Sequence, residues 1–124
     1  MVYAGAHHSW FVTRSGLYSS GCNDDGEVGQ PEDADFKYKT PTLLRGFNNA
    51  VSDIRCGYQH SIILCTDHTV YACGLNNKSQ LGSSQDSNSH TLRQVVVPPI
   101  KSISCGFYFS VMQTCTFLEQ ILTK

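Results

Sequence analysis

The chain has 124 residues, of which 40% are hydrophobic and 15% are charged, and its formal net charge at pH 7 is −1. This composition excludes a disordered chain, and the near-zero charge gives no sign of the basic surface that nucleic-acid binding requires. No stretch reaches the roughly 18 apolar residues of a membrane span, and no positive segment precedes an apolar block, so we expect neither a membrane segment nor a signal peptide.

The first predicted strands lie close to the N-terminus. A β-branched and aromatic segment at residues 9–13 is followed by a Ser-Gly turn and by a second strand at residues 17–21. A polar block with fixed glycines, residues 22–30, comes next. Residues 31–40 are expected to form a surface loop, and residues 41–44 enter the next strand region.

The same order of elements returns about fifty residues later. Residues 51–54 alternate apolar and polar, which is the period of a half-buried strand. A hairpin follows, with strands at residues 61–65 and 70–74. The polar connector at residues 83–90 is expected to be a second surface loop, and residues 92–97 enter the next strand region. Neither unit shows a helical period.

A third unit begins but is not completed. Residues 101–104 alternate apolar and polar again, but after Ser110 no turn residues stand at 114–116 and no returning strand follows. We expect a repeat region at residues 1–113 and a divergent tail at residues 114–124. The last eight residues are expected either to form a short helix or to fray.

A short glycine motif marks the start of each unit. Gly5, Gly57 and Gly106 lie 52 and 49 residues apart. A fixed period of this size is typical of propellers, solenoids and arrays, in which each repeat needs neighbours to bury its apolar face. The predicted repeats span residues of about 2–53 and 54–102, with a partial repeat at 103–113.

Two blocks of the second repeat carry a family resemblance. Residues 54–64 read Ile-Arg-Cys-Gly-Tyr-Gln-His-Ser-Ile-Ile-Leu, and residues 71–82 read Tyr-Ala-Cys-Gly-Leu-Asn-Asn-Lys-Ser-Gln-Leu-Gly. The first resembles the signature of the regulator of chromosome condensation repeat, in which two free positions separate a glycine from a histidine. The second resembles the W-G-x-N-x-x-G-Q-L-G block of the same family. The first repeat matches with Glu27 where glutamine is usual, and Phe109 replaces the histidine of the third. The resemblance covers the chain from about residue 2 to 112.

The resemblance implies an all-β fold. The complete family fold is a β-propeller of seven four-stranded blades, in which radial closure hides the sheet edges. A chain with about two repeats and the start of a third makes an incomplete propeller. We therefore expect a fragment or truncated isoform of a longer repeat protein, assembly with further repeats, or self-association of a chain that is poorly stable alone.

Several residue types recur at fixed places in the repeats, and we interpret them as structural. Glycine at a fixed offset predicts a positive φ or a close backbone approach, and asparagine predicts a turn bonded to its own backbone. Imidazole could serve as a metal ligand or an acid–base group. Catalytic groups usually occur once, however, so each repeated histidine is expected to bond a backbone carbonyl within its blade. The structural positions are Gly5, His8, Gly21, Asn23, Gly29, Gly57, His60, Gly74, Asn76, Gly82 and Gly106.

An acidic segment is the one feature that indicates a partner surface. Six of the ten carboxylate side chains fall within twelve positions, namely Asp24, Asp25, Glu27, Glu32, Asp33 and Asp35. Such a loop could meet a basic partner and improve the specificity of association. The alternative, which we favour, is a solvated connector.

These observations favour a non-catalytic protein-binding module, a scaffold or adaptor whose loops contact the partner. The rival function is guanine-nucleotide exchange on a small GTPase of the Ran type, and a non-functional truncated product is a third interpretation. We expect no catalytic residue, no cofactor and no metal site. The six cysteines form no C-x-x-C pair, so reduced cysteines in a cytoplasmic or nuclear protein are expected.

Overall fold

The computed structural model describes residues 1–32, 37–82 and 87–115. Within these ranges the chain is entirely β, with ten strands and no helix. The described ranges therefore hold no helix that is long and apolar enough to cross a membrane. The strands are β1 Val2–Ala4, β2 His8–Thr13, β3 Gly16–Cys22, β4 Lys37–Leu43, β5 Val51–Cys56, β6 His60–Cys65, β7 Val70–Gly74, β8 Ser89–Gln94, β9 Ile100–Cys105 and β10 Ser110–Thr114.

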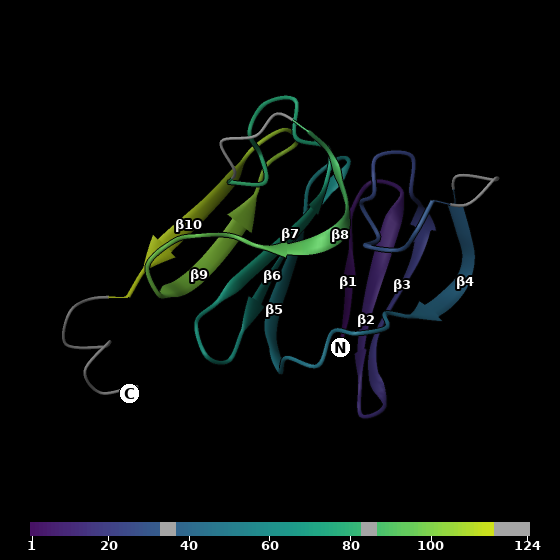
Figure 1. The fold of residues 1–124 in the computed structure, drawn as a ribbon, viewed down its shortest axis with the longest axis horizontal. Helices are drawn as coiled ribbons and strands as arrows, with labels where there is room; N and C mark the ends of the chain where they lie inside the picture. The colour runs from purple at the N-terminus through teal and green to yellow at the C-terminus, as the bar shows by residue number, and fades with distance from the viewer. Residues whose placement is uncertain (33–36, 83–86, 116–124) are drawn as a thin grey trace.

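The strands form three separate antiparallel sheets that stand side by side (Figure 1). Their strand orders are β1-β2-β3-β4, β5-β6-β7-β8 and β9-β10. The first strand of the second sheet, β5, contacts both β1 and β9, and the later strands lie progressively farther out. The predicted all-β fold and incomplete propeller are confirmed: two four-stranded blades are followed by the first two strands of a third.

The two predicted surface loops are partly wrong. β4 begins at Lys37 and β8 begins at Ser89, inside the segments expected to be loops. Both are the outermost strands of their sheets, and they carry polar residues on both faces. A strand exposed in this way shows no apolar alternation, so the periodicity gave no sign of it. The predicted helix or frayed end of the tail lies outside the described residues.

Each glycine motif makes room for the ring three residues later. The amide of Gly5 donates to the carbonyl oxygen of His8 at 2.8 Å, and the same bond joins Gly57 to His60 and Gly106 to Phe109, both at 2.9 Å. A Cβ atom on Gly5 would lie 2.5 Å from Cε1 of His8. The three motifs therefore share one backbone geometry that only glycine fits.

Another glycine lies at or next to the end of the third strand of each complete blade. Gly21 and Gly74 have φ angles of 108° and 110°, which is the positive φ predicted from their spacing. They pair with His8 and His60 across the sheet. A Cβ atom on Gly21 would lie 2.5 Å from the carbonyl oxygen of His7, so the strands approach too closely for any side chain.

Two apolar cores fill the spaces between the sheets. The first lies between the first two sheets and includes Trp10, Leu17, Leu44, Ile54, Ile63 and Cys73. The second lies between the second and third sheets and includes Ile62, Leu64, Val70, Leu81, Ile100 and Ile103. β6 supplies both cores, and all six of its residues are buried. The middle sheet is thus covered on both faces, as in a closed propeller.

Candidate functional site

A buried serine joins the first and second sheets. The hydroxyl of Ser61 donates to the carbonyl oxygen of Glu27 at 2.7 Å. Its lone pairs accept hydrogen bonds from Nε2 of His8 and from Nε1 of Trp10, both at 2.9 Å. Because the hydroxyl proton is already used, Nε2 of His8 must carry the proton of the neutral imidazole. We call this arrangement the histidine–serine contact.

The same contact joins the second and third sheets. Nε2 of His60 lies 3.0 Å from Oγ of Ser110, which donates to the carbonyl oxygen of Gln80 at 2.6 Å. The expectation that each imidazole bonds a carbonyl within its own blade is therefore wrong. Each ring reaches the serine of the following sheet, because the turn after the glycine points the ring across the interface rather than along its own strand.

Both histidines are neutral at physiological pH. Burial lowers the pKa of His8 to about 4, with a smaller contribution from nearby His60. Burial also lowers the pKa of His60 to about 4. An imidazole with a pKa this low is a poor acid–base catalyst near neutral pH. In each histidine, Nε2 is hydrogen-bonded to a serine hydroxyl of the next sheet.

The polar block after each third strand folds around one asparagine. Oδ1 of Asn23 accepts from the amide of Val28 at 3.3 Å, and Oδ1 of Asn76 accepts from the amide of Leu81 at 3.0 Å. The side chains of Val28 and Leu81 are buried as the apolar anchors of these loops. The glycines that follow, Gly29 and Gly82, have φ angles of 66° and 71°.

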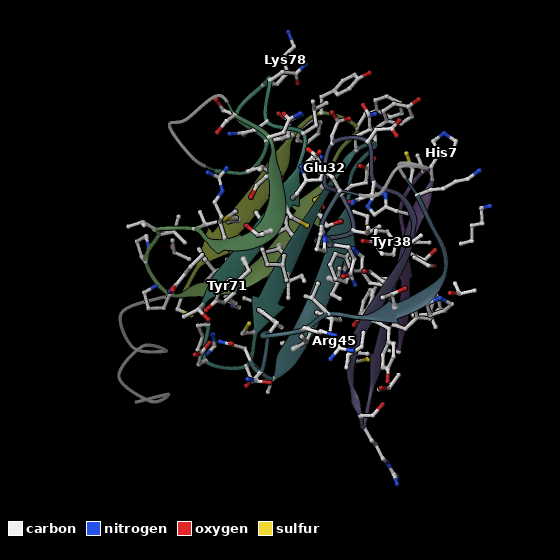
Figure 2. All side chains as sticks on the ribbon, turned by 45° about the vertical axis from the view of Figure 1, so that its right-hand side comes forward. His7, Glu32, Tyr38, Arg45, Tyr71 and Lys78 are labelled. Carbon is white, nitrogen blue, oxygen red and sulfur yellow. The ribbon has the colours of Figure 1, made fainter. Side chains whose placement is uncertain are left out.

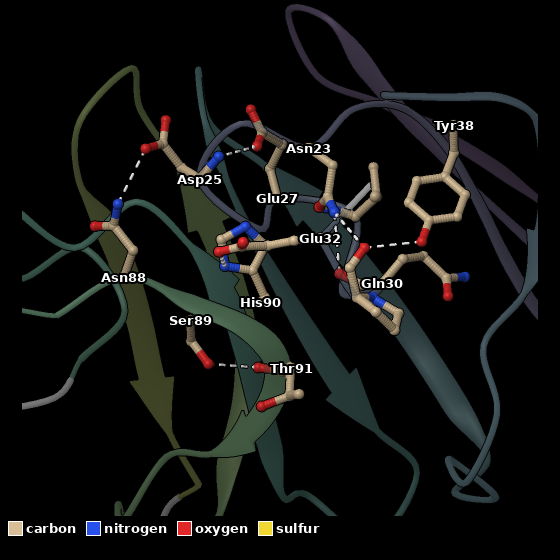
Figure 3. Close-up of polar contacts among 12 residues, drawn as sticks. Asn23, Asp25, Glu27, Gln30, Glu32, Tyr38, Asn88, Ser89, His90 and Thr91 are labelled. Atoms are coloured by element: carbon tan, nitrogen blue, oxygen red, sulfur yellow. Dashed lines mark hydrogen bonds and ion pairs between the residues drawn. The ribbon is translucent and has the colours of Figure 1, made fainter. Parts of the chain in front are cut away.

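Glu27 does not belong to an exposed acidic surface. Its residue is 0% exposed, Oε1 accepts from the amide of Asp25 at 2.9 Å, and Oε2 is buried with no hydrogen-bond partner among the described residues. Figure 3 shows the Asp25 bond. Burial raises the pKa of Glu27 to about 7. The sequence placed Glu27 with its acidic neighbours, whereas the loop turns this side chain inward.

The remaining carboxylates of the acidic segment divide into two groups. Asp24 is exposed, while Asp25 contacts the connector that precedes β8 and Glu32 contacts β8 itself (Figure 3). Oδ1 of Asp25 accepts from Nδ2 of Asn88 at 3.0 Å, and Oε1 of Glu32 lies 3.8 Å from Nδ1 of His90. These contacts tie the loop of the first sheet to the second sheet. Asp33 and Asp35 lie outside the described residues.

Cys56, Cys73 and Cys105 take part in packing rather than in a reactive site. All six are free thiols. Burial raises the pKa of Cys56 to about 12 and that of Cys105 to about 11, and it raises the pKa of Cys73 well above its usual value. A thiol that resists ionisation is a weak nucleophile. The described residues contain no cluster of three His, Cys, Asp or Glu side chains suited to a metal ion.

An aromatic ridge at one end of the sheets was missed by the sequence reasoning. It consists of His7, Tyr58, Phe107 and Tyr108, from the turns that open the second strand of each sheet. The rings of Tyr58 and Phe107 stack at 4.3 Å, and that of Tyr108 meets the Phe107 ring edge-on at 4.7 Å. His7, labelled in Figure 2, meets Tyr58 at 5.8 Å.

The signal for this ridge was present in the sequence. The repeat signature leaves the two positions after each glycine free, so no structural need explains aromatic residues there. Phe107 and Tyr108 are also 56% and 46% exposed, so the rings at these positions are not part of the core. Exposed, contiguous aromatic rings mark interaction surfaces more often than isolated apolar residues do.

Comparison with known proteins supports this geometry. A family model described as "Regulator of chromosome condensation (RCC1) repeat" matches residues 15–64 and 67–113, and a second model of the same description matches residues 51–80. The chain is 32% identical over 115 residues to the Protein RCC2 homolog of Danio rerio, covering 89% of this chain and 23% of that protein.

Two further similarities extend the comparison. The Secretion-regulating guanine nucleotide exchange factor of Bos taurus is 34% identical over 100 residues, covering 78% of this chain and 20% of that protein. The crystal structure of Prp20p from Saccharomyces cerevisiae, a protein studied for its binding to Gsp1p and histones, superposes with a TM-score of 0.81 at 21% identity. It covers 98% of this chain and 32% of that one. The chain thus spans less than a quarter of the curated relatives' length.

The histidine–serine contact predicts that two serines at equivalent repeat positions differ greatly in how much they stabilise the fold. Ser61→Ala should lower the free energy of unfolding by about 2–3 kcal/mol, because it leaves His8, Trp10 and a buried carbonyl without their shared partner. Ser9→Ala, at the same repeat position in the first sheet, should change it by less than about 0.5 kcal/mol. Ser9 has no side-chain hydrogen bond to any described residue. Urea unfolding measures both, and equal losses would contradict the contact.

The burial of Glu27 predicts that replacing it with a neutral side chain stabilises the fold at high pH but not at low pH. Its pKa is raised on folding, so its stabilising contribution is complete below about pH 4.5 and is lost as pH rises to about 7. Glu27→Gln should therefore stabilise the chain by about 1–2 kcal/mol at pH 8 and have little effect at pH 4.5. Gln80, at the equivalent position, accepts from the Lys78 amide at 2.8 Å and shows that glutamine fits.

The control for this prediction is Glu32→Gln, because the Glu32 side chain is 73% exposed. Thermal unfolding at pH 4.5 and pH 8 compares both variants with the parent chain. An equal gain for Glu32→Gln at pH 8, or a gain for Glu27→Gln that does not change with pH, would show that burial of Glu27 is not the cause.

Proposed function

Since the chain belongs to the regulator of chromosome condensation (RCC1) repeat family, we propose that it is a non-catalytic protein-binding module. It acts as a scaffold or adaptor that presents side chains from the turns at one end of its blades. Loops held on rigid sheets are the usual place for binding residues. The recurring histidines and glycines belong to the packing of the sheets, which leaves the variable turn positions free to contact a partner.

The observation that carries this proposal is the aromatic ridge. Three successive turns supply its rings, and their mutual stacking fixes the rings before any partner arrives. Preordered aromatic side chains lose little conformational entropy on binding, and they are enriched among the residues that dominate interface energies. The acidic segment contributes at most Asp24 and Glu32 from its described part, since Glu27 is buried.

The partner is a protein, and a small GTPase is one candidate. This assignment is supported by Prp20p, which was studied for binding to Gsp1p and histones. We place the chain in the nucleus or cytoplasm. The repeat bounds at residues 2–53, 54–102 and 103–113, and the structural role of the recurring positions, belong to the same proposal.

The rival function is guanine-nucleotide exchange on a GTPase of the Ran type. It is supported by the name of the bovine relative. Exchange requires a broad face that distorts the nucleotide site, and this chain covers 20% of that relative. A binding module needs only the surface that two or three blades supply, so binding is the function that the described geometry favours.

A binding assay combined with nucleotide release separates the two functions. Immobilised chain is titrated with Gsp1p and with histones, and release of a fluorescent nucleotide from Gsp1p is followed in parallel. We expect saturable binding of at least one probe without faster release. The double variant Phe107→Ser/Tyr108→Ser should bind about tenfold more weakly, because it removes the centre of the ridge.

The matched control is Val96→Ser, since Val96 is 98% exposed and lies away from the ridge turns. It should bind like the parent chain. Faster nucleotide release would establish the rival function. Absence of binding to both probes, or an equal loss in the Val96 control, would count against the ridge.

Assembly with further repeats is the second part of the proposal. β10 is the outer strand of a two-stranded sheet, and Val111, on its face away from the second sheet, is 54% exposed. Light scattering of the isolated chain should show association that increases with concentration, and Val111→Lys should reduce it. A monomer with a sharp, concentration-independent thermal transition would contradict this expectation.

A further inference from the structure

A groove runs along the outer seam between the first and second sheets. Its walls come from β4 on one side and from β7 and β8 on the other, and the segment between β4 and β5 crosses it. We call it the seam groove. It has a volume of about 490 Å³, which is within the range of ligand and peptide sites. Figure 2 shows Tyr38 and Tyr71 on its two sides, with Arg45 between them and lower in the view.

The apolar walls of the seam groove are already ordered. The rings of Phe47 and Tyr71 meet edge-on at 5.1 Å, and Nδ2 of Asn49 donates to the Tyr71 hydroxyl at 3.4 Å. At the other end, the hydroxyl of Tyr38 donates to the carbonyl oxygen of Pro31 at 2.8 Å. These side chains and Leu92 are only partly buried or exposed, so they still offer apolar surface to a partner.

The charge of the residues that line the seam groove favours an acidic partner segment. Fourteen residues line it, and Arg45 is the only one that carries a formal charge, with no aspartate or glutamate among them. Arg45 is exposed and makes no ion pair with any described residue. An unpaired guanidinium beside aromatic and aliphatic walls is complementary to an apolar side chain that has a carboxylate nearby.

The neighbouring strands decide how such a segment would lie. β4 and β8 are the outermost strands of their sheets, so the groove is open on its outer side. β4 carries Lys39 and Pro41, which oppose the addition of a continuous strand at that edge. A partner is therefore held through side chains that enter the groove, rather than by extending the sheet.

We propose that the seam groove binds an extended acidic segment of a partner protein. One aromatic or aliphatic side chain packs against Phe47, Tyr71 and Leu92, and an adjacent carboxylate pairs with Arg45. This inference rests on the proposed function, a protein-binding module, and gives that module a second surface. The seam groove lies on the outer side of the blades, whereas the aromatic ridge lies at their end, so each surface is tested separately.

The probe is a fluorescein-labelled nonapeptide in which aspartates and glutamates flank a central Phe-Val pair. Fluorescence anisotropy measures its binding to the full chain at low and high salt. We expect saturable binding that weakens as salt is added. A peptide with lysines in place of the acidic residues, and one with serine in place of phenylalanine, should each bind about tenfold more weakly.

Two variants test the groove by different means. Arg45→Glu reverses its charge, and Thr91→Trp fills it from an exposed position on β8 without a change of charge. Each should weaken the acidic probe about tenfold or more. Arg14→Glu is the matched control, because Arg14 is an exposed arginine in the β2–β3 hairpin outside the groove, and it should bind like the parent chain apart from its small effect on net charge.

The outcomes separate this inference from the proposed function. Probe binding that survives both groove variants, or that Arg14→Glu weakens as much as Arg45→Glu does, overturns the groove as the site. Failure of the parent chain to bind the acidic probe, or a preference for the lysine peptide, overturns the inference as well. In each case, binding of Gsp1p or histones to the parent chain and to the Phe107→Ser/Tyr108→Ser variant still decides whether the chain is a protein-binding module.

Discussion

The fold depends on a buried serine hydroxyl shared between neighbouring sheets. Ser61 gives its proton to a carbonyl of the first sheet and accepts N–H groups from His8 and Trp10. Three polar groups are thereby satisfied in a place that water does not reach, where a lost partner costs more than the bond gains. The same arrangement at Ser110 repeats the spacing between the second and third sheets. Burial in these interfaces lowers the pKa of both repeated histidines and keeps them neutral.

This constraint separates the positions that build the blades from those that are free to vary. Each contact between sheets uses the glycine, the histidine three residues later and a serine of the following sheet. The two positions after the glycine take no part in that contact, and the first of them holds the stacked rings of Tyr58 and Phe107 in the second and third units. The seam groove arises in a similar way, because the outer strands diverge where the inner strands pack closely.

Several parts of the site were predictable from particular residues. The spacing of Gly21 and Gly74 indicated a positive φ, and Asn23 and Asn76 indicated loops closed on their own backbone; the structure has both. Glu27 shows the limit of this reasoning. Its acidic neighbours Asp24 and Asp25 are exposed and half-buried, but the Glu27 side chain turns inward. Only the alignment of Glu27 with the buried Gln80 of the second repeat could have indicated this.

The sequence by itself determined the period, the hairpins and the family, because glycine geometry and apolar alternation are local properties that each repeat shows independently. Only the tertiary structure decided which partner each histidine takes, that the outer polar segments pair as strands, and that residues from three turns meet in one ridge. These depend on how separate sheets lie against one another. Contacts between repeats are set by that packing, about fifty residues apart in sequence, and no local pattern encodes them.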